Sequence, residues 1–171
     1  MQPLPIPARA WTGISTDFMT DLPPTRTGAT NMLIITCRLT GNVILEDLVT
    51  IDTPTVANAF LKCFFRHHGF PEWIVSDRGT QWVSGLWARL CELLGIDCKL
   101  LTSHHQQTDG GNERMNQEVH AYLRCYTTFS QQNWADLLPA AQLSINNRPR
   151  GNGPSPFFAT HGLNVSPIQE V

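Results

Sequence analysis

The first third of the chain alternates between short apolar runs and turn residues. Residues 11–20, 32–37 and 43–49 are apolar at alternate or successive positions over strand length, with proline, glycine and asparagine in the connections. Connections this short join antiparallel neighbours. Residues 32–35 are apolar at every position, which indicates a strand covered on both faces. We therefore expect three antiparallel strands in this part of the chain.

After residue 55 the spacing of apolar positions changes from the strand period to the helix period. Gly69 and Pro71 end the first such helix. Helices then alternate with short apolar strands, the order typical of parallel pairing through right-handed crossovers. Ser155-Pro156 provides a helix cap with proline at the first helical position. The elements expected are helix 56–65, strand 73–76, helix 86–94, strand 96–101, helices from about 111 to 129 and 133 to 146, and a last short helix after residue 155.

The order of these elements predicts an α/β fold. Five strands, three antiparallel and two parallel, would form one mixed sheet flanked by helices. A length of 171 residues, 42% of them hydrophobic, suits a single core. We divide the chain into a linker at 1–10, which holds three prolines, one domain at 11–165 and a tail at 166–171.

Composition excludes several classes of protein. No run approaches the roughly 18 apolar residues of a membrane span, and no basic segment precedes an apolar signal core. The five cysteines are odd in number and show no C-x-x-C spacing, which fits thiols in a reducing compartment rather than a disulfide framework or a zinc knuckle. The net charge of −2 shows that the chain does not have the excess of basic residues expected of a domain that binds DNA tightly by itself. Any DNA affinity would be local and weak, or supplied by flanking segments.

Three carboxylates are the candidate catalytic residues. Asp17 interrupts an apolar run, Asp77 closes another before a turn, and Glu113 opens a helix after a glycine pair. A charge inside a strand is costly to bury unless it is paired or metal-bound. Brought together by the fold, the three would be able to hold divalent metal ions for phosphoryl transfer. Spacing alone does not establish this, because an aspartate and a glutamate with the separation of Asp77 and Glu113 often occur by chance. A strand-end aspartate before Arg-Gly is, by itself, more often a turn former.

The sequence around these residues resembles a known family. Residues 76–82 (SDRGTQW) and 102–116 (TSHHQQTDGGNERMN) look like the two central blocks of the integrase catalytic core of gypsy-type LTR retrotransposons. Residues 11–23 resemble its first block, and shorter matches extend the likeness over nearly the whole chain. The resemblance implies a ribonuclease-H-like fold and a catalytic, metal-binding triad of Asp17, Asp77 and Glu113.

The resemblance also implies a reaction. Such a core is a DNA-integrating polynucleotidyl transferase, which performs 3′-end processing and strand transfer of retrotransposon DNA into target DNA. It uses two Mg²⁺ or Mn²⁺ ions per active site, with Asp17 touching both ions and Asp77 and Glu113 one each. The implied partners are the element and target DNA and a second copy of the chain. The implied location is the nucleus, or a cytoplasmic particle before it, and the family's zinc-binding and chromatin-binding or DNA-binding domains would be absent from this chain.

Polar residues near the two central blocks are the candidate DNA contacts. The helix that begins near Glu113 has a polar face opposite an apolar stripe of Met115, Val119, Tyr122 and Tyr126, and residues 103–112 form a polar, glycine-bearing loop. A plain solvated face explains the helix pattern equally well. The candidates are Gln81, His104, Gln106, Gln107 and Asn112, followed on the helix by Asn116, Gln117, His120 and Arg124.

The chain departs from the family pattern in the loop before Glu113. Gln106 stands where the family usually has proline, and Gly111-Asn112 where it has Gln-Thr. Two alternatives stay open: a nuclease of the same fold, for which the sequence offers no obvious fourth acidic residue, and a decayed or domesticated core that serves dimerisation or host-factor binding.

Two further groups of basic residues lie at a helix end and in a loop. His67-His68 precedes Gly69 at a helix end, where a cationic imidazole is favoured. Arg148 and Arg150 lie in a proline- and glycine-bearing loop, where they would serve either phosphate contacts or solubility.

Overall fold

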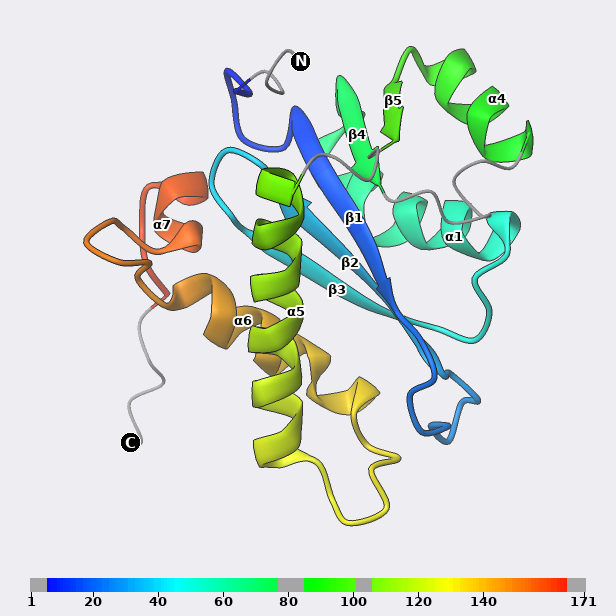
Figure 1. The fold of residues 1–171 in the computed structure, drawn as a ribbon, viewed down its shortest axis with the longest axis vertical. Coiled ribbons are helices and arrows are strands. Elements are labelled where there is room, and N and C mark those ends of the chain that lie inside the picture. Colours follow the sequence, from blue (N-terminus) through cyan, green and yellow to red (C-terminus); the bar gives the residue numbers. More distant parts are fainter. Residues whose placement is uncertain (1–5, 77–84, 101–105, 166–171) are drawn as a thin grey trace.

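A five-stranded mixed sheet forms the centre of the molecule (Figure 1). The computed structural model describes residues 6–76, 85–100 and 106–165. The strand order is β3-β2-β1-β4-β5; β1 pairs antiparallel with β2 and β2 with β3, whereas β1 with β4 and β4 with β5 are parallel. The predicted fold class is therefore confirmed. The strands are β1 (Gly13–Met19), β2 (Asn31–Cys37), β3 (Val43–Leu48), β4 (Trp73–Ser76) and β5 (Asp97–Leu100).

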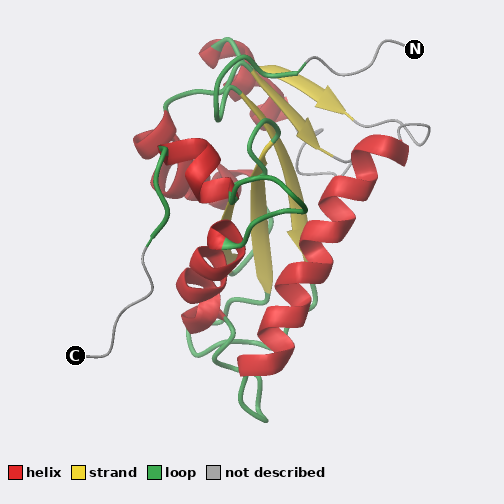
Figure 2. Cartoon of the chain, turned by 90° about the vertical axis from the view of Figure 1, so that its left-hand side faces the viewer, coloured by secondary structure: helices red, strands yellow, loops and turns green. Residues whose placement is uncertain are grey.

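Helices cover both faces of the sheet (Figures 1 and 2). One face is covered by a continuous helical rod and by α4, and the other by the long helix α5 together with α6. The rod consists of α1 (Thr53–Ala59), the π-helical segment η1 (Phe60–Phe65) and α2 (Arg66–His68); the other helices are α4 (Gly85–Leu94), α5 (Gln106–Tyr126), the 3-10 turn η2 (Ala135–Leu137), α6 (Leu138–Asn147) and α7 (Pro156–His161). No helix in the described part of the chain is both long and apolar enough to cross a membrane.

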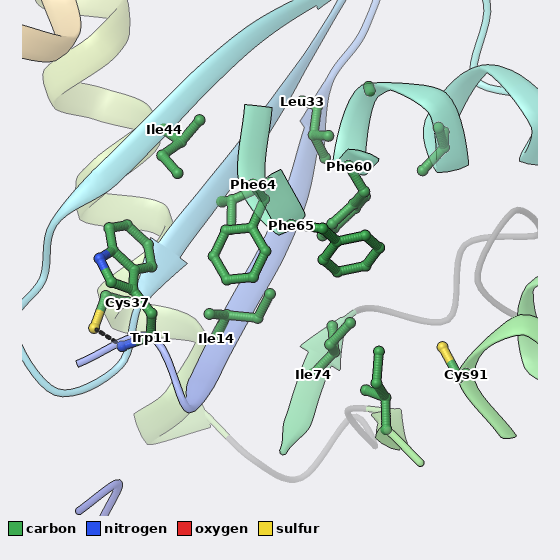
Figure 3. Packing of buried hydrophobic residues seen from close by; sticks show 14 of the residues in the cluster. Trp11, Ile14, Leu33, Cys37, Ile44, Phe60, Phe64, Phe65, Ile74 and Cys91 are labelled. Atoms are coloured by element: carbon green, nitrogen blue, oxygen red, sulfur yellow. Dashed lines mark hydrogen bonds between the residues drawn. The ribbon is translucent and has the colours of Figure 1, made fainter. Parts of the chain in front are cut away.

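Alternation along the strands divides the core into two clusters. Successive side chains of a strand point to opposite faces, so Ile14 of β1 joins the cluster under η1 while Met19 joins the cluster under α5. Figure 3 shows the first cluster, where the Trp11 ring meets Phe64 edge-on with centroids 5.6 Å apart. The backbone N–H of Trp11 donates a hydrogen bond to Sγ of Cys37 at 3.2 Å. The sheet is thus buried on both faces, as the continuous apolar run in β2 indicates.

The outer edge of β3 is covered by side chains of α6. The amide of Asn146 accepts a hydrogen bond from Val43 N–H at 2.7 Å and donates one to the Val43 carbonyl at 2.8 Å. Gln142 accepts a third bond, from Leu45 N–H at 2.9 Å. An edge strand otherwise presents unpaired backbone groups, so these amides satisfy the edge and attach α6 to the sheet.

The last short helix begins as its sequence predicts. Ser155 Oγ accepts a hydrogen bond from Phe158 N–H at 3.0 Å, and Pro156 occupies the first turn of α7. Gly162 ends the helix with φ of 77°, a conformation that favours glycine.

Three boundaries of the predicted helices α5 and α6 are wrong. α5 begins at Gln106 rather than near residue 111, so most of the expected polar loop is helical, and it ends at Tyr126 rather than 129. A glycine inside a helix costs about 1 kcal/mol, and the burial of Met115 and Val119 against the sheet offsets that cost for the pair at 110–111. α6 begins at Leu138 rather than 133, because a turn and η2 precede it.

The prediction of a cationic imidazole at the end of the first helix is wrong for His68. The His68 ring stacks on Trp11 with centroids 4.5 Å apart. Its burial, reinforced by the nearby His67 and His161, lowers the pKa of His68 to about 4. The ring is therefore neutral at pH 7 and acts as a packing residue.

Candidate active site

Asp17 lies inside β1, the central strand of the sheet, on the face that α5 covers. Its carboxylate is half-buried. Oδ2 accepts a hydrogen bond from the side-chain amide of Asn116 at 2.7 Å, and Oδ1 accepts one from the backbone N–H of Phe18 at 2.8 Å. The strand interior predicted for this acid is confirmed, and its charge is stabilised by two donors.

A narrow crevice lies beside Asp17. Side chains of β1, β2 and α5 line it, namely Ser15, Asp17, Ile34, Thr36, Met115 and Asn116. Oδ1 of Asn116 is buried there and has no hydrogen-bond partner among the described residues. Carboxylate and amide oxygens are the hard ligands that Mg²⁺ prefers. These oxygens are of the type that a divalent cation prefers, but the crevice itself has no room for a water-sized group.

The strand register brings the segment before Asp77 beside the segment before Asp17. Ser76, the last residue of β4, pairs in parallel with Thr16. Asp17 follows Thr16 in the sequence, as Asp77 follows Ser76. Asp77 itself lies outside the described residues, as do the candidate DNA contacts Gln81 and His104.

Glu113 lies on α5 with an exposed side chain. Residues three apart on a helix share one face, so Glu113 is one turn ahead of Asn116, the partner of Asp17. The described residues contain no group of three His, Cys, Asp or Glu side chains close enough to hold a metal, a set that does not include Asp77. The structure thus places two of the three predicted acids on elements joined by a hydrogen bond.

The remaining candidates follow α5. Gln117, His120 and Arg124 are exposed, as a polar face requires, and Asn116 is half-buried against Asp17. The backbones of Gln106, Gln107 and Asn112 belong to the first turns of the helix, and their side chains are outside the description.

The apolar stripe of α5 differs from the predicted one at its end. Met115, Val119 and Leu123 are buried in the core, whereas Tyr126 is 61% exposed. Leu123 lies four residues after Val119 and continues the helical period more closely than Tyr122. Tyr126 instead rests on Tyr122, with ring centroids 4.6 Å apart.

Asn116 is the site residue whose role the sequence does not reveal. The sequence places it among the DNA contacts, whereas in the structure its amide holds Asp17. The only signal was its position three residues after Glu113, on the same helix face. Its partner is 99 positions away in the sequence, so only the fold could identify it.

Comparison with known proteins finds relatives among transposon products. No family model matches the sequence. The transposon Tf2-3 and Tf2-4 polyproteins of Schizosaccharomyces pombe are each 29% identical to it over 148 residues, or 86% of this chain. The same alignment covers 11% of each polyprotein, so the chain spans about a tenth of the length of these relatives.

Two solved structures share the fold. A chain of the simian T-cell lymphotropic virus intasome, solved in complex with PP2A regulatory subunit B56 gamma, superimposes with a TM-score of 0.77 at 17% identity, covering 99% of this chain and 61% of that one. The catalytic core domain of BIV integrase superimposes with a TM-score of 0.69 at 19% identity, covering 88% of this chain and 93% of that one. Together with the transposon relatives, they confirm the resemblance to integrase catalytic cores that the sequence motifs indicate.

Proposed function

We propose that this chain, a relative of transposon polyproteins with the fold of an integrase catalytic core, is the catalytic part of a DNA-integrating polynucleotidyl transferase. The observation that carries the proposal is the bond between Asp17 in the central strand and Asn116, one helical turn after Glu113. It links the two elements that bear the acids of the first and last motif blocks.

The environment of Asp17 suits a metal ligand. The amide of Asn116 is neutral, so it orients one carboxylate oxygen and leaves the negative charge in place. An ionised carboxylate has about four lone-pair sites, and hydrogen bonds from Asn116 and Phe18 orient that of Asp17. Such a carboxylate is able to accept hydrogen bonds and bind a cation at the same time.

The proposed ligands are Asp17, Asp77 and Glu113, with Mg²⁺ or Mn²⁺ as the ions. A bound pair of such ions supplies charge stabilisation at phosphorus and activation of an oxygen nucleophile. The protein's own contribution is orientation: β1 and Asn116 fix the Asp17 carboxylate, and α5 presents Glu113 at the surface, where a DNA strand has access.

The proposed reactions are two displacements at phosphorus. In 3′-end processing the nucleophile is water, and in strand transfer it is the 3′-hydroxyl that processing leaves. Each displacement breaks one phosphodiester bond as it forms one new P–O bond, so no covalent bond to the protein is required.

The proposed DNA contacts extend from the acids along α5. Beyond Glu113, the side chains of Gln117, His120 and Arg124 are exposed on this helix, and hydrogen-bond donors of this kind position a backbone without reading its sequence. Gln81, His104, Gln106, Gln107 and Asn112 complete the proposed set.

We also propose a second copy of the chain as a partner and the nucleus as the place of action. Analytical ultracentrifugation of the wild-type chain tests whether two copies associate.

The decisive experiment is reversal of strand joining on a branched DNA, with Mg²⁺ or Mn²⁺, for the wild type, Glu113→Gln and Asp17→Asn. We expect metal-dependent cleavage and rejoining by the wild type, and a loss of at least a hundredfold in each variant. A second readout is independent of activity: Mn²⁺ should raise the thermal unfolding temperature of the wild type more than that of Asp17→Asn, because binding to the native state stabilises it.

Asp136→Asn is the matched control, since Asp136 is an exposed carboxylate in η2, outside the candidate site. It should retain both the activity and the metal-induced shift. A folded wild type that is inactive with both metals and shows no shift would exclude the transferase and favour a decayed core with a binding role.

A further inference from the structure

A groove with three arginines lies between α5 and α6, away from Asp17. Its wider part, about 390 Å³, is lined by Arg114, Gln117, Tyr122 and Tyr126 of α5 and by Arg148 after α6, among others. A second hollow of about 250 Å³ is lined by Arg114, Glu118, Arg148 and Arg150. The two hollows share Arg114, Glu118, Ile145 and Arg148, so they form one continuous surface, which we call the arginine groove.

The arginine groove is positively charged although the chain as a whole is not. Three guanidinium groups face one carboxylate, that of Glu118, in a chain of net charge −2. Arg150 Nη2 is 3.9 Å from Glu118 Oε2, beyond hydrogen-bond length, and has no hydrogen-bond partner among the described residues. Arg114 and Arg148 are exposed. The groove therefore has spare donors and a local excess of positive charge.

The donors of this groove match phosphate. The guanidinium fork binds two phosphate oxygens at once, and its charge persists at any physiological pH. The Gln117 amide and the Tyr122 and Tyr126 hydroxyls add neutral donors along the same surface. None of these groups requires a particular base, so the expected ligand is a nucleic-acid backbone rather than a base edge.

The position of the groove relates it to the proposed active site. Arg114 directly follows Glu113, so the groove begins on the turn of α5 that carries the acid. From Arg114 to Tyr126 the helix rises about 18 Å. Phosphates of one DNA strand advance about 3.4 Å each along the duplex axis. The groove is thus long enough for about five successive phosphates.

We propose that the arginine groove binds the sugar–phosphate backbone of duplex DNA and holds it beside Glu113. This rests on the proposed function, because it assigns a path to the DNA that the transferase would act on. Arg114 and Arg148 make the phosphate contacts. Arg150 lies against Gly41 in the β2–β3 turn and close to Glu118, and it holds the loop after α6 in place.

The test measures binding of a 30-base-pair duplex by the wild-type chain as a function of NaCl concentration. Arg114→Ala with Arg148→Ala should weaken binding roughly tenfold and reduce the slope of log affinity against log salt by about 2, since each lost phosphate contact removes about 0.9. Two unrelated duplex sequences should give the same change. Arg148→Glu alone provides a second variant at an exposed position.

The control is Arg26→Ala with Arg66→Ala, which removes the same charge at exposed positions outside the groove. It should leave the slope unchanged, and thermal unfolding should show that every variant is folded. If the wild type binds DNA and the groove and control variants behave alike, the groove assignment is overturned while the proposed function stands. If the folded wild type does not bind duplex DNA at any salt concentration, the groove assignment fails as well, and the branched-DNA reaction alone decides the proposed function.

Discussion

The side-chain amide of Asn116 donates a hydrogen bond to Oδ2 of Asp17 at 2.7 Å, across 99 positions of sequence. It attaches the middle of α5 to the central strand, next to the buried Met115. Glu113 lies one turn earlier on the same helix. One hydrogen bond thereby joins the helix that carries one candidate acid to the strand that carries another.

Asn116→Ala should leave the chain folded and disturb its metal dependence. Without the amide, the Asp17 carboxylate loses its orientation, and loss of a residue that orients a metal ligand typically costs 10 to 100-fold in metal affinity or activity. We expect the Mn²⁺ concentration for half-maximal activity on branched DNA to rise by roughly tenfold or more. Asn147→Ala, which removes a single bond to the Val165 carbonyl, is the matched control. An unchanged metal dependence in Asn116→Ala would show that Asn116 does not orient Asp17.

Asn146→Ala should be among the most destabilising substitutions in α6. It removes both bonds to Val43 and leaves a buried N–H and a buried carbonyl without partners. Each unsatisfied buried group costs about 1 to 3 kcal/mol, so we expect a loss of about 2 to 6 kcal/mol in urea unfolding. Asn147→Ala should cost about 1 kcal/mol or less. Equal losses in the two variants would contradict the role given to Asn146 at the β3 edge.

His68→Phe should make the protein less sensitive to acid. The pKa of His68 is about 4 in the folded state, below its usual value of 6.5, so the unfolded state binds the proton first. Its contribution to stability is complete above pH 6.5 and is lost as the pH falls from there towards 4. Allowing for the partly exposed ring, the wild type should lose about 1 kcal/mol more than His68→Phe between pH 7.5 and 4.5.

The readout is the free energy of unfolding at both pH values. Phenylalanine keeps an aromatic ring against Trp11, so the two proteins should differ little at pH 7.5. His120→Asn, a change at an exposed position on α5, should leave the acid sensitivity in place. Parallel losses in the wild type and His68→Phe would mean that His68 does not remain neutral in the fold.

Glu46→Gln should stabilise the protein at neutral pH. Burial raises the pKa of Glu46, and the neighbouring Asp47 adds to the rise while Lys62 opposes it. The raised pKa means that the charged form is disfavoured in the fold, a penalty that is present at neutral pH and disappears as the pH falls below the usual range of a glutamate. We expect a gain of about 0.5 kcal/mol at pH 7, discounted for partial exposure, that vanishes near pH 4.

Glu72→Gln is the control for this pH series, because its carboxylate is exposed and meets Arg9 only at 4.0 Å. Its unfolding curve should follow the wild type across the range. A Glu46→Gln gain that persists at acidic pH would point to a change in packing rather than in charge.

Sequence patterns predicted most of this architecture because their physical causes are local. The short apolar runs of β1 and β2, the apolar spacing of the helices and the Ser155 cap each depend on residues within a few positions of one another. Patterns failed where distant packing competes with local preference. α5 continues through the glycine pair at 110–111, and Tyr126 is left outside the core because Leu123 occupies the buried position.

Part of the candidate site could likewise be predicted from the sequence, and part of it depended on the fold. The sequence by itself determined the identities of Asp17 and Glu113 as unusual carboxylates, the motif blocks around them and the strand interior that holds Asp17. Only the tertiary structure decided that Asn116 holds Asp17 and that Arg114, Arg148 and Arg150 share one groove. Both arrangements join residues on different elements, and the packing of α5 against the sheet and α6 fixes such distances, whereas no local pattern in the chain encodes them.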